Sequence, residues 1–140
     1  SATSNKEDMK FDVIIASIGA RYQNYCSSMS RTFLVDPPAV VSKNYDLLVE
    51  LQTACLSVMK PGNDLSSVYS EAVSFLKAKK RDDLVSSLPK NLGFAIGLDF
   101  RDNNLILNTK NTTMFRANQV FHLSLGFQDI ALDDAERCKC

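Results

Sequence analysis

The side chains of this sequence that could do chemistry are few and widely spaced. The chain has one histidine, His122, together with sixteen acidic residues and four cysteines. A hydrolase needs an identifiable nucleophile, base or metal set, yet no carboxylate stands at ligand-like spacing from His122. A glycine-rich phosphate loop, a nucleophile elbow and a zinc-binding pair of histidines are all missing from the sequence. The residues taken alone therefore predict a domain without a recognisable catalytic set.

One catalytic alternative stays open at this point. His122 alternates with Phe121 and Leu123 in a strand-like segment, so it shares a strand face with Ser124. A hydroxyl and an imidazole on one face would suit a metal-independent hydrolase. Because no acidic residue is placed to orient the imidazole, a structural role for His122 is the better interpretation.

The four cysteines indicate a reducing compartment. Cys55 falls on the apolar face of a predicted helix and Cys26 falls in a predicted strand, so both are expected to be buried free thiols. Cys138 and Cys140 form a tail pair without further ligands nearby, which argues against a zinc site. These features favour a cytosolic or nuclear protein.

Length, composition and charge indicate one soluble domain. The 140 residues are 45% apolar and 23% charged, as is ordinary for a globular protein. Sixteen basic residues balance the sixteen acidic ones, so no global field attracts nucleic acid or an anionic membrane. No apolar run approaches the roughly 20 residues that span a bilayer. We expect a polar leader over 1–10, a domain over 11–130 and a tail over 131–140.

The pattern of apolar residues predicts an α+β domain. Two apolar segments, 11–18 and 25–35, are expected to form a hairpin whose turn is supplied by 19–24. Apolar residues then recur every three or four positions over 40–60, which predicts an amphipathic helix. Asp64 is placed to cap a second helix that ends near Arg81. The remaining expected elements are a short helix over 82–88 and strands over 92–100, 105–107 and 119–127, with a tight turn at Asn103-Asn104.

The segment 19–35, GARYQNYCSSMSRTFLV, resembles the first metal-binding hairpin of the pita-bread metallopeptidases, the fold of aminopeptidase P, creatinase and methionine aminopeptidase. The positions in register with that hairpin are Gly19, Tyr22, Tyr25, Ser27, Arg31, Thr32 and Phe33. In the same register, the two metal-binding aspartates of the family fall on Ser17 and Ser28. The resemblance therefore implies the scaffold but not its first two metal ligands.

Two later segments extend the resemblance. Residues 97–102 and 115–126 are similar to two further motifs of the family. In register with them, a metal-binding histidine falls on Phe94, a catalytic histidine on Arg101 and a metal-binding glutamate on Ser124. Neutral hydroxyls and a phenyl ring cannot replace the oxygen donors that hold a divalent pair. The resemblance thus implies no metal, no cofactor and no peptidase activity.

The pattern of replacements resembles one branch of this fold, the N-terminal peptidase-like domains of the large subunit of the FACT histone chaperone complex. The segments that carry this likeness are Tyr25-Cys26-Ser27, Arg31-Thr32, 91–102, 108–111 and 125–129. Relative to that family the domain is expected to be incomplete at both ends, and 131–140 does not resemble the continuation.

The resemblance implies a nuclear, chromatin-associated protein that acts on nucleosomes during transcription and replication. The implied partners are core histones, other chromatin factors and, through other domains of a longer chain, an HMG-type smaller subunit; direct nucleic-acid binding by this domain is not expected. A vestigial cleft, the former substrate site, would be lined by Ser17, Ser28, Phe94, Arg101 and Ser124. An inert scaffold that only positions neighbouring domains remains the alternative.

Overall fold

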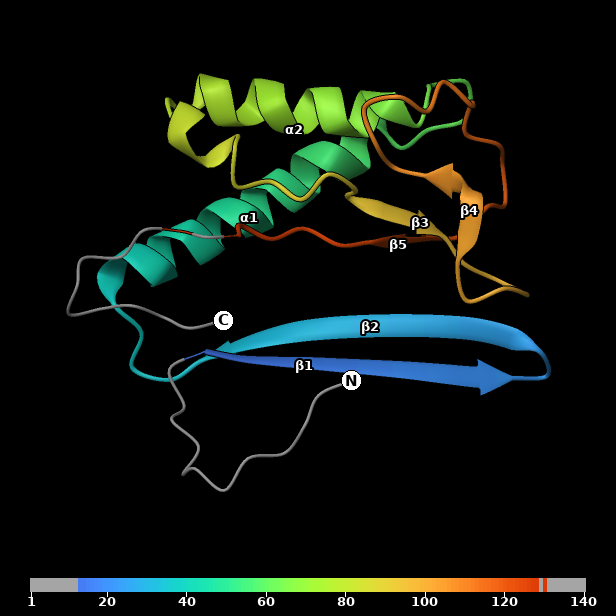
Figure 1. Cartoon of the computed structure of the whole chain (residues 1–140), viewed down its shortest axis with the longest axis horizontal. Coiled ribbons are helices and arrows are strands. Elements are labelled where there is room, and N and C mark those ends of the chain that lie inside the picture. Colours follow the sequence, from blue (N-terminus) through green and yellow to red (C-terminus); the bar gives the residue numbers. More distant parts are fainter. Residues whose placement is uncertain (1–12, 129, 131–140) are drawn as a thin grey trace.

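A computed structural model describes residues 13–128 and residue 130. The elements stack in layers, with helix α2 outermost, then α1, then a small sheet, and a long hairpin on the far side of that sheet (Figure 1). In chain order they are β1 (Val13–Tyr22), β2 (Tyr25–Leu34), α1 (Ala39–Val58), α2 (Ser66–Ala78), the 3-10 turn η1 (Asp82–Leu84), β3 (Gly93–Ala95), β4 (Asp102–Ile106) and β5 (Phe121–Leu123). The predicted α+β class is confirmed. No helix within the described residues is both long and apolar enough to cross a membrane.

Strands β1 and β2 form an antiparallel hairpin in continuous register from Val13 opposite Leu34 to Tyr22 opposite Tyr25. The turn consists of Gln23 and Asn24 alone, whose φ angles are 45° and 65°. Two consecutive left-handed residues match the twist of the strands, so the hairpin closes in two residues. The expected turn over 19–24 was therefore too long.

The two helices begin and end close to their predicted positions. Helix α1 starts after Pro38, whose carbonyl accepts the Val41 and Ser42 N–H groups. The predicted Asp64 cap is wrong, because the Asp64 main-chain carbonyl rather than its carboxylate accepts the Ser67 N–H (3.0 Å) and hydroxyl (2.6 Å). Asp64 is engaged in an isolated β-bridge with Met114, and α2 begins at Ser66. The expected helix over 82–88 is only the 3-10 turn η1.

The small sheet has the order β4-β3-β5, with both pairings antiparallel. The predicted turn at Asn103-Asn104 is wrong, since both residues lie inside β4. Between the pairs Phe94–Ile106 and Ala95–Asp102 the register shifts, so 103–105 bulge out of the ladder. Side chains supply hydrogen bonds there: the Asn104 N–H donates to Asp102 Oδ1 (2.8 Å), and Asn111 Nδ2 donates to the Asn104 carbonyl (2.9 Å). Turn-forming residues thus make a bulge here.

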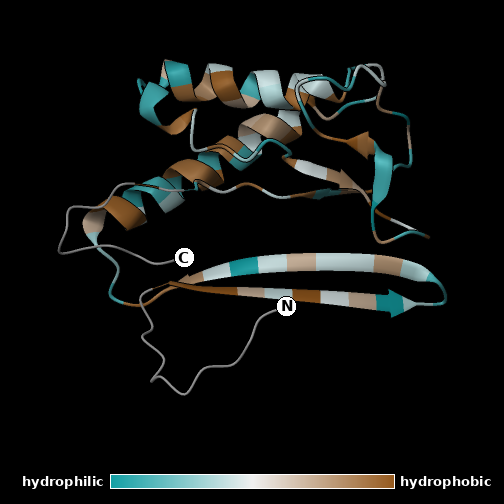
Figure 2. Cartoon of the chain, viewed as in Figure 1, coloured by the Kyte–Doolittle hydropathy of each residue, from teal (hydrophilic) through white to brown (hydrophobic). Residues whose placement is uncertain are grey.

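The hydrophobic core lies between the helices and the small sheet. Apolar residues recur along the ribbon of both layers (Figure 2). The buried members of the core are Leu51, Cys55, Leu65, Val68, Ala72, Leu76, Leu84, Leu88, Leu92, Leu107 and Phe115. None of these comes from the hairpin, in which Cys26 is the one buried residue. The core therefore holds the sheet against the helices and leaves one face of the sheet turned toward the hairpin.

Candidate binding site

One face of the hairpin carries Ser17 and Ser28, two of the residues that are expected to line the vestigial cleft. Residues directly opposite in an antiparallel pair share a face, so Ser17 and Ser30 lie beside Gly19 and Ser28. The Ser17 and Ser30 hydroxyls are hydrogen bonded to each other at 2.8 Å. Ser28 is half-buried and Ser17 is exposed. The structure thus brings the two predicted hairpin positions onto a common surface.

This face turns toward the segment that follows β3. The Cys26 N–H donates to the Gly97 carbonyl oxygen (2.7 Å), and the Cys26 thiol lies 3.9 Å from the Leu98 carbonyl oxygen. A Cβ atom at Gly19 would lie 3.4 Å from Cε2 of Phe100. The absence of a side chain at Gly19 therefore lets the Phe100 ring approach the hairpin beside Ser28.

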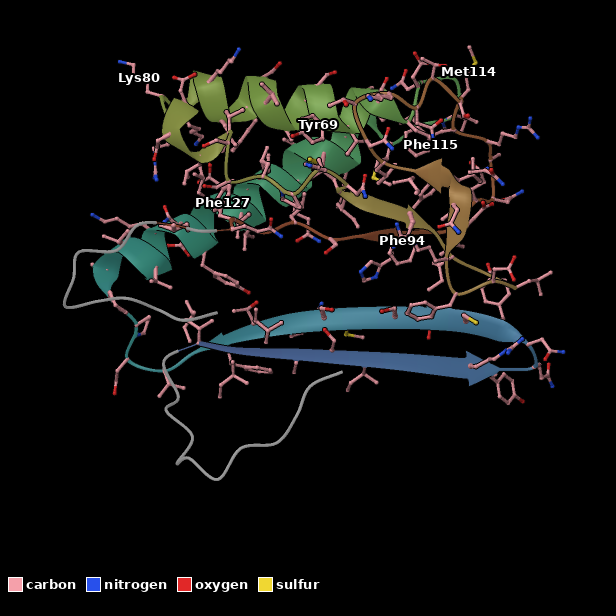
Figure 3. The ribbon with its side chains drawn as sticks, in the orientation of Figure 1. Tyr69, Lys80, Phe94, Met114, Phe115 and Phe127 are labelled. Carbon is pink, nitrogen blue, oxygen red and sulfur yellow. The ribbon has the colours of Figure 1, made fainter. Side chains whose placement is uncertain are left out.

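Phe94 is the centre of a cluster at the edge of this surface, close to β4 and β5 (Figure 3). Strand pairing places Phe94 opposite His122, and their rings stack with centroids 5.1 Å apart at 25°. The Arg101 Cζ atom lies 5.3 Å from the Phe94 ring centroid, within cation–π range. Phe100 packs at a tilt, 6.2 Å between centroids. We refer to Phe94, Phe100, Arg101 and His122 as the Phe94 cluster.

Ser124 is placed differently from the other predicted site residues. It follows β5 directly, its N–H donates to the Leu92 carbonyl (2.8 Å), and its side chain is exposed. The neighbouring His122 ring packs on Phe94 rather than against a carboxylate. Phe94 and Arg101 are therefore in contact, Ser17 and Ser28 face the same region through Gly19 and Phe100, and Ser124 marks the end of β5.

The donor set does not fit a divalent metal pair. The four positions that the sequence resemblance predicts as former ligand positions offer the hydroxyls of Ser17, Ser28 and Ser124 and the ring of Phe94, with no carboxylate among them. Within residues 13–128 and 130, no group of three or more His, Cys, Asp or Glu side chains is arranged to hold a metal ion. The cluster instead offers aromatic faces and one guanidinium, a surface that can pack on an apolar side chain and pair with a carboxylate.

Sequence reasoning missed two members of the cluster. Phe100 was assigned to a predicted strand and to the motif over 97–102, and His122 to a structural role or, as the alternative, to that of a base; neither was expected to line the cleft. The stack between Phe94 and His122 joins residues 28 positions apart, so it depends on the pairing of β3 with β5. The one local signal was Gly19, whose lack of a side chain suits close approach of another group.

Comparison with known proteins places the chain in a family. The family model described as Metallopeptidase family M24 matches residues 1–136. The FACT complex subunit SPT16 of Dictyostelium discoideum is 37% identical over 131 residues, which are 94% of this chain and 12% of that protein. The subunit of the same name from Oryza sativa subsp. japonica is 43% identical over 132 residues, 92% of this chain and 12% of that protein. The chain therefore spans only a small part of these relatives.

Solved structures agree with both the family and the fold. The N-terminal domain of FACT complex subunit SPT16 from Cicer arietinum superposes with a TM-score of 0.87 at 43% identity, covering 96% of this chain and 32% of that one. An X-Pro aminopeptidase from Thermotoga maritima gives a TM-score of 0.74 at 26% identity, covering 84% of this chain and 33% of that one. A prolidase from Pyrococcus furiosus, 22% identical with a TM-score of 0.78 over 89% of this chain and 36% of that one, shares the fold. The predicted pita-bread scaffold and the predicted likeness to the FACT large subunit are confirmed.

Proposed function

The chain belongs to metallopeptidase family M24, and we propose that it is a non-catalytic, peptidase-like binding module of a histone chaperone that acts on nucleosomes during transcription and replication. The observation that carries the proposal is the strong likeness to FACT subunit SPT16. It is supported by the side chains at the four predicted ligand positions, Ser17, Ser28, Phe94 and Ser124, none of which carries a charged oxygen donor. Nuclear, chromatin-associated localisation follows from the same likeness.

The loss of catalysis is argued from chemistry. A metal-dependent peptidase needs charged oxygen donors to hold its ions and to activate water. Ser17, Ser28 and Ser124 carry neutral hydroxyls, and the Phe94 ring is occupied by its stack with His122. A neighbouring donor can compensate for a single lost carboxylate, whereas replacement of all four positions leaves no ligand set. A metal-independent hydrolase would need His122 as its base. The His122 ring stacks on Phe94 instead, which argues against that role.

The surface between the hairpin and the Phe94 cluster is the part of the module that we propose contacts a peptide segment. Arg101 is exposed and pairs with Phe94, so its guanidinium is oriented by the ring while its N–H groups remain able to bind a carboxylate. The proposed partners are core histones and other chromatin factors, with an HMG-type smaller subunit engaged through other domains of a longer chain.

The test is a titration of the 140-residue chain with H2A–H2B and with H3–H4 at physiological ionic strength. We expect saturable binding of one pair, weakened about tenfold by Arg101→Ala, as for an arginine at the centre of an interface. Arg116→Ala, an exposed arginine outside the Phe94 cluster, is the matched control and should leave the affinity unchanged. No binding of either pair would overturn the histone-binding role, and equal loss in both variants would overturn the cleft as the contact surface.

Two further measurements address catalysis and the scaffold alternative. Stoichiometric manganese, cobalt or zinc in the pure protein, or release of product from an X-Pro peptide, would overturn the non-catalytic assignment. One observation favours the scaffold alternative. Arg101 and His122 pack against Phe94, so side chains of the chain itself fill the cluster. Unchanged histone binding by a full-length subunit that lacks this domain would support the scaffold over the binding module.

A further inference from the structure

A second pocket, remote from the Phe94 cluster, lies beside the helical layer. Its volume is about 220 Å³, and it is bordered by α2, by the segment before β3 and by the loop after β4. The lining residues are Tyr69, Lys90, Asn91, Asn108, Thr109 and Lys110. Tyr69 projects from the helical layer, whereas Phe94 lies toward the hairpin (Figure 3). The pocket is therefore separate from the surface proposed above.

The loop that carries Thr109 and Lys110 is held by a network of hydrogen bonds. Asn108 Oδ1 accepts the N–H groups of Lys110 (2.9 Å) and Asn111 (3.0 Å). Asn111 Nδ2 donates to the Ile106 carbonyl (3.0 Å), and the Asn111 carbonyl accepts the Ser66 N–H at the start of α2 (2.9 Å). The backbone beneath Lys110 is thus fixed to both β4 and α2, so the wall of the pocket does not have to be ordered when a ligand binds.

The residues that line the pocket include two lysines, Lys90 and Lys110, together with Tyr69, Asn91 and Thr109, and none of the lining residues is acidic. In the described part of the chain the ion pairs are Lys79–Glu50 and Arg81–Asp83, so no acidic residue of that part forms an ion pair with either lysine of the pocket. The chain as a whole has no net charge, and this local excess of positive charge therefore selects for an anion.

We propose that this pocket binds a phosphate monoester. A monoester carries about −1.5 to −2 charges at neutral pH and three acceptor oxygens, which match two ammonium groups and several neutral donors. A carboxylate carries a single charge and two oxygens, so it would leave part of this donor set unpaired. Lys90, Thr109 and Lys110 are exposed, so a phosphorylated side chain of a partner protein can reach the pocket, and we take such a side chain as the source. The inference does not depend on histone binding.

The test follows backbone amide shifts of the isotopically labelled chain during titrations with inorganic phosphate and with a phosphoserine peptide, at constant ionic strength. Both ligands should shift the amides of Asn91, Lys110 and Asn111 saturably, and the peptide should bind more tightly than the ion. The same peptide without phosphate should cause no shift. Tighter binding of inorganic phosphate than of the peptide would assign the pocket to the free ion and overturn the phosphoprotein as its source.

The variant that removes the charge is Lys90→Ala with Lys110→Ala, for which we expect at least about a tenfold loss of affinity, since charge-assisted hydrogen bonds contribute most of the binding. Lys60→Ala with Lys77→Ala removes two exposed lysines elsewhere and should leave the affinity unchanged. Lys110→Arg should retain binding. Equal losses in the two double variants, shifts that do not saturate, or a short DNA duplex that binds these residues more tightly than the monoester would overturn the proposal.

Discussion

Cys55 lies in the middle of the core on α1, with no accessible surface, and its thiol is directed at the Val68 carbonyl oxygen (3.9 Å). The helical spacing of apolar residues predicted this burial, and the structure confirms it for Cys55 as well as for Cys26. Burial raises the pKa of the Cys55 thiol from 9.0 to about 11, with a smaller contribution from the negative charge of Glu71. The thiol therefore stays protonated and unreactive at neutral pH.

Cys55 should make the fold less stable in alkali. In the unfolded chain the thiol loses its proton near pH 9, whereas in the folded chain it keeps the proton until about pH 11. Between these values the unfolded state binds fewer protons, so the free energy of unfolding falls as pH rises. Two pKa units correspond to roughly 2–3 kcal/mol by pH 11. Denaturant titrations from pH 8 to pH 11 should show this fall, and Cys55→Ala should remove it.

The readout for Cys55 is the difference in the free energy of unfolding between wild type and variant at each pH, rather than either curve alone. Cys55→Ala leaves a small cavity and should lower stability by about 1–2 kcal/mol at pH 8. That deficit should shrink and then disappear toward pH 11, as the wild type alone loses stability through its thiol. A wild-type curve parallel to that of the variant throughout the window would contradict the assigned pKa.

At the scale of elements, Gly93 determines how closely β3 approaches β5. Its φ angle is 150°, and a Cβ atom there would lie 2.1 Å from the His122 carbonyl oxygen and 3.1 Å from Leu123 Cα. Both obstacles are backbone atoms, which cannot move without separating the strands. The stack between Phe94 and His122 therefore depends on the absence of a side chain at Gly93.

Gly93→Ala should lower the free energy of unfolding by about 3 kcal/mol or more, because overpacking against backbone adds to the strain of a positive φ. Gly126→Ala is the matched control: among the described residues, no atom beyond its two chain neighbours lies within 4 Å of its added Cβ, and its effect should stay within about 0.5 kcal/mol. Chemical denaturation measures both, and amide shifts of His122 report the opening of the stack. Similar values for the two variants would show that β3 and β5 are not closely paired.

The elements that the sequence predicted well are those defined by local periodicity. The spacing of apolar residues located α1 and α2 within a few positions, and the two apolar segments at the start of the chain located the hairpin. The short strands were predicted less well, because β3 and β5 have three residues each and are fixed by pairing partners far along the chain. Asn103 and Asn104 were misread for a related reason: their preference for left-handed or hydrogen-bonded backbone suits a bulge as well as a turn.

The candidate site was predictable only as positions in a resemblance. Register with a hairpin and two later motifs of a known family identified Ser17, Ser28, Phe94, Arg101 and Ser124, and nothing in their own chemistry marks them as a group. Their arrangement depends on three sets of contacts between residues far apart in the sequence. These are the pairing of β1 with β2, the approach of Phe100 to Gly19, and the pairing of β3 with β5. The sequence does not specify those distances, and so the roles of Phe100 and His122 came from the structure.

At the scale of the whole molecule, the described chain divides into a core and an attached hairpin. The core unites α1, α2 and the small sheet, whereas the hairpin contributes one buried side chain, Cys26. The outer face of the hairpin is apolar and exposed, with 72% of Ile18, 77% of Tyr22 and 56% of Met29 accessible. A two-stranded hairpin has little stability of its own in water, so this part should open without unfolding the core.

Amide hydrogen exchange, followed by mass spectrometry or NMR, tests whether the hairpin opens independently of the core. We expect amides of β1 and β2 to exchange at least about 100-fold faster than core amides such as Leu51 and Val68, since local opening costs less than global unfolding. Leu51→Ala should cost about 2–5 kcal/mol of global stability and raise exchange in both helices. Ile18→Thr, on the exposed face, should leave the helices unchanged. Equal protection of hairpin and helices would show that the contacts of Cys26 and Gly19 with 97–100 are strong enough to make the hairpin part of one cooperative unit.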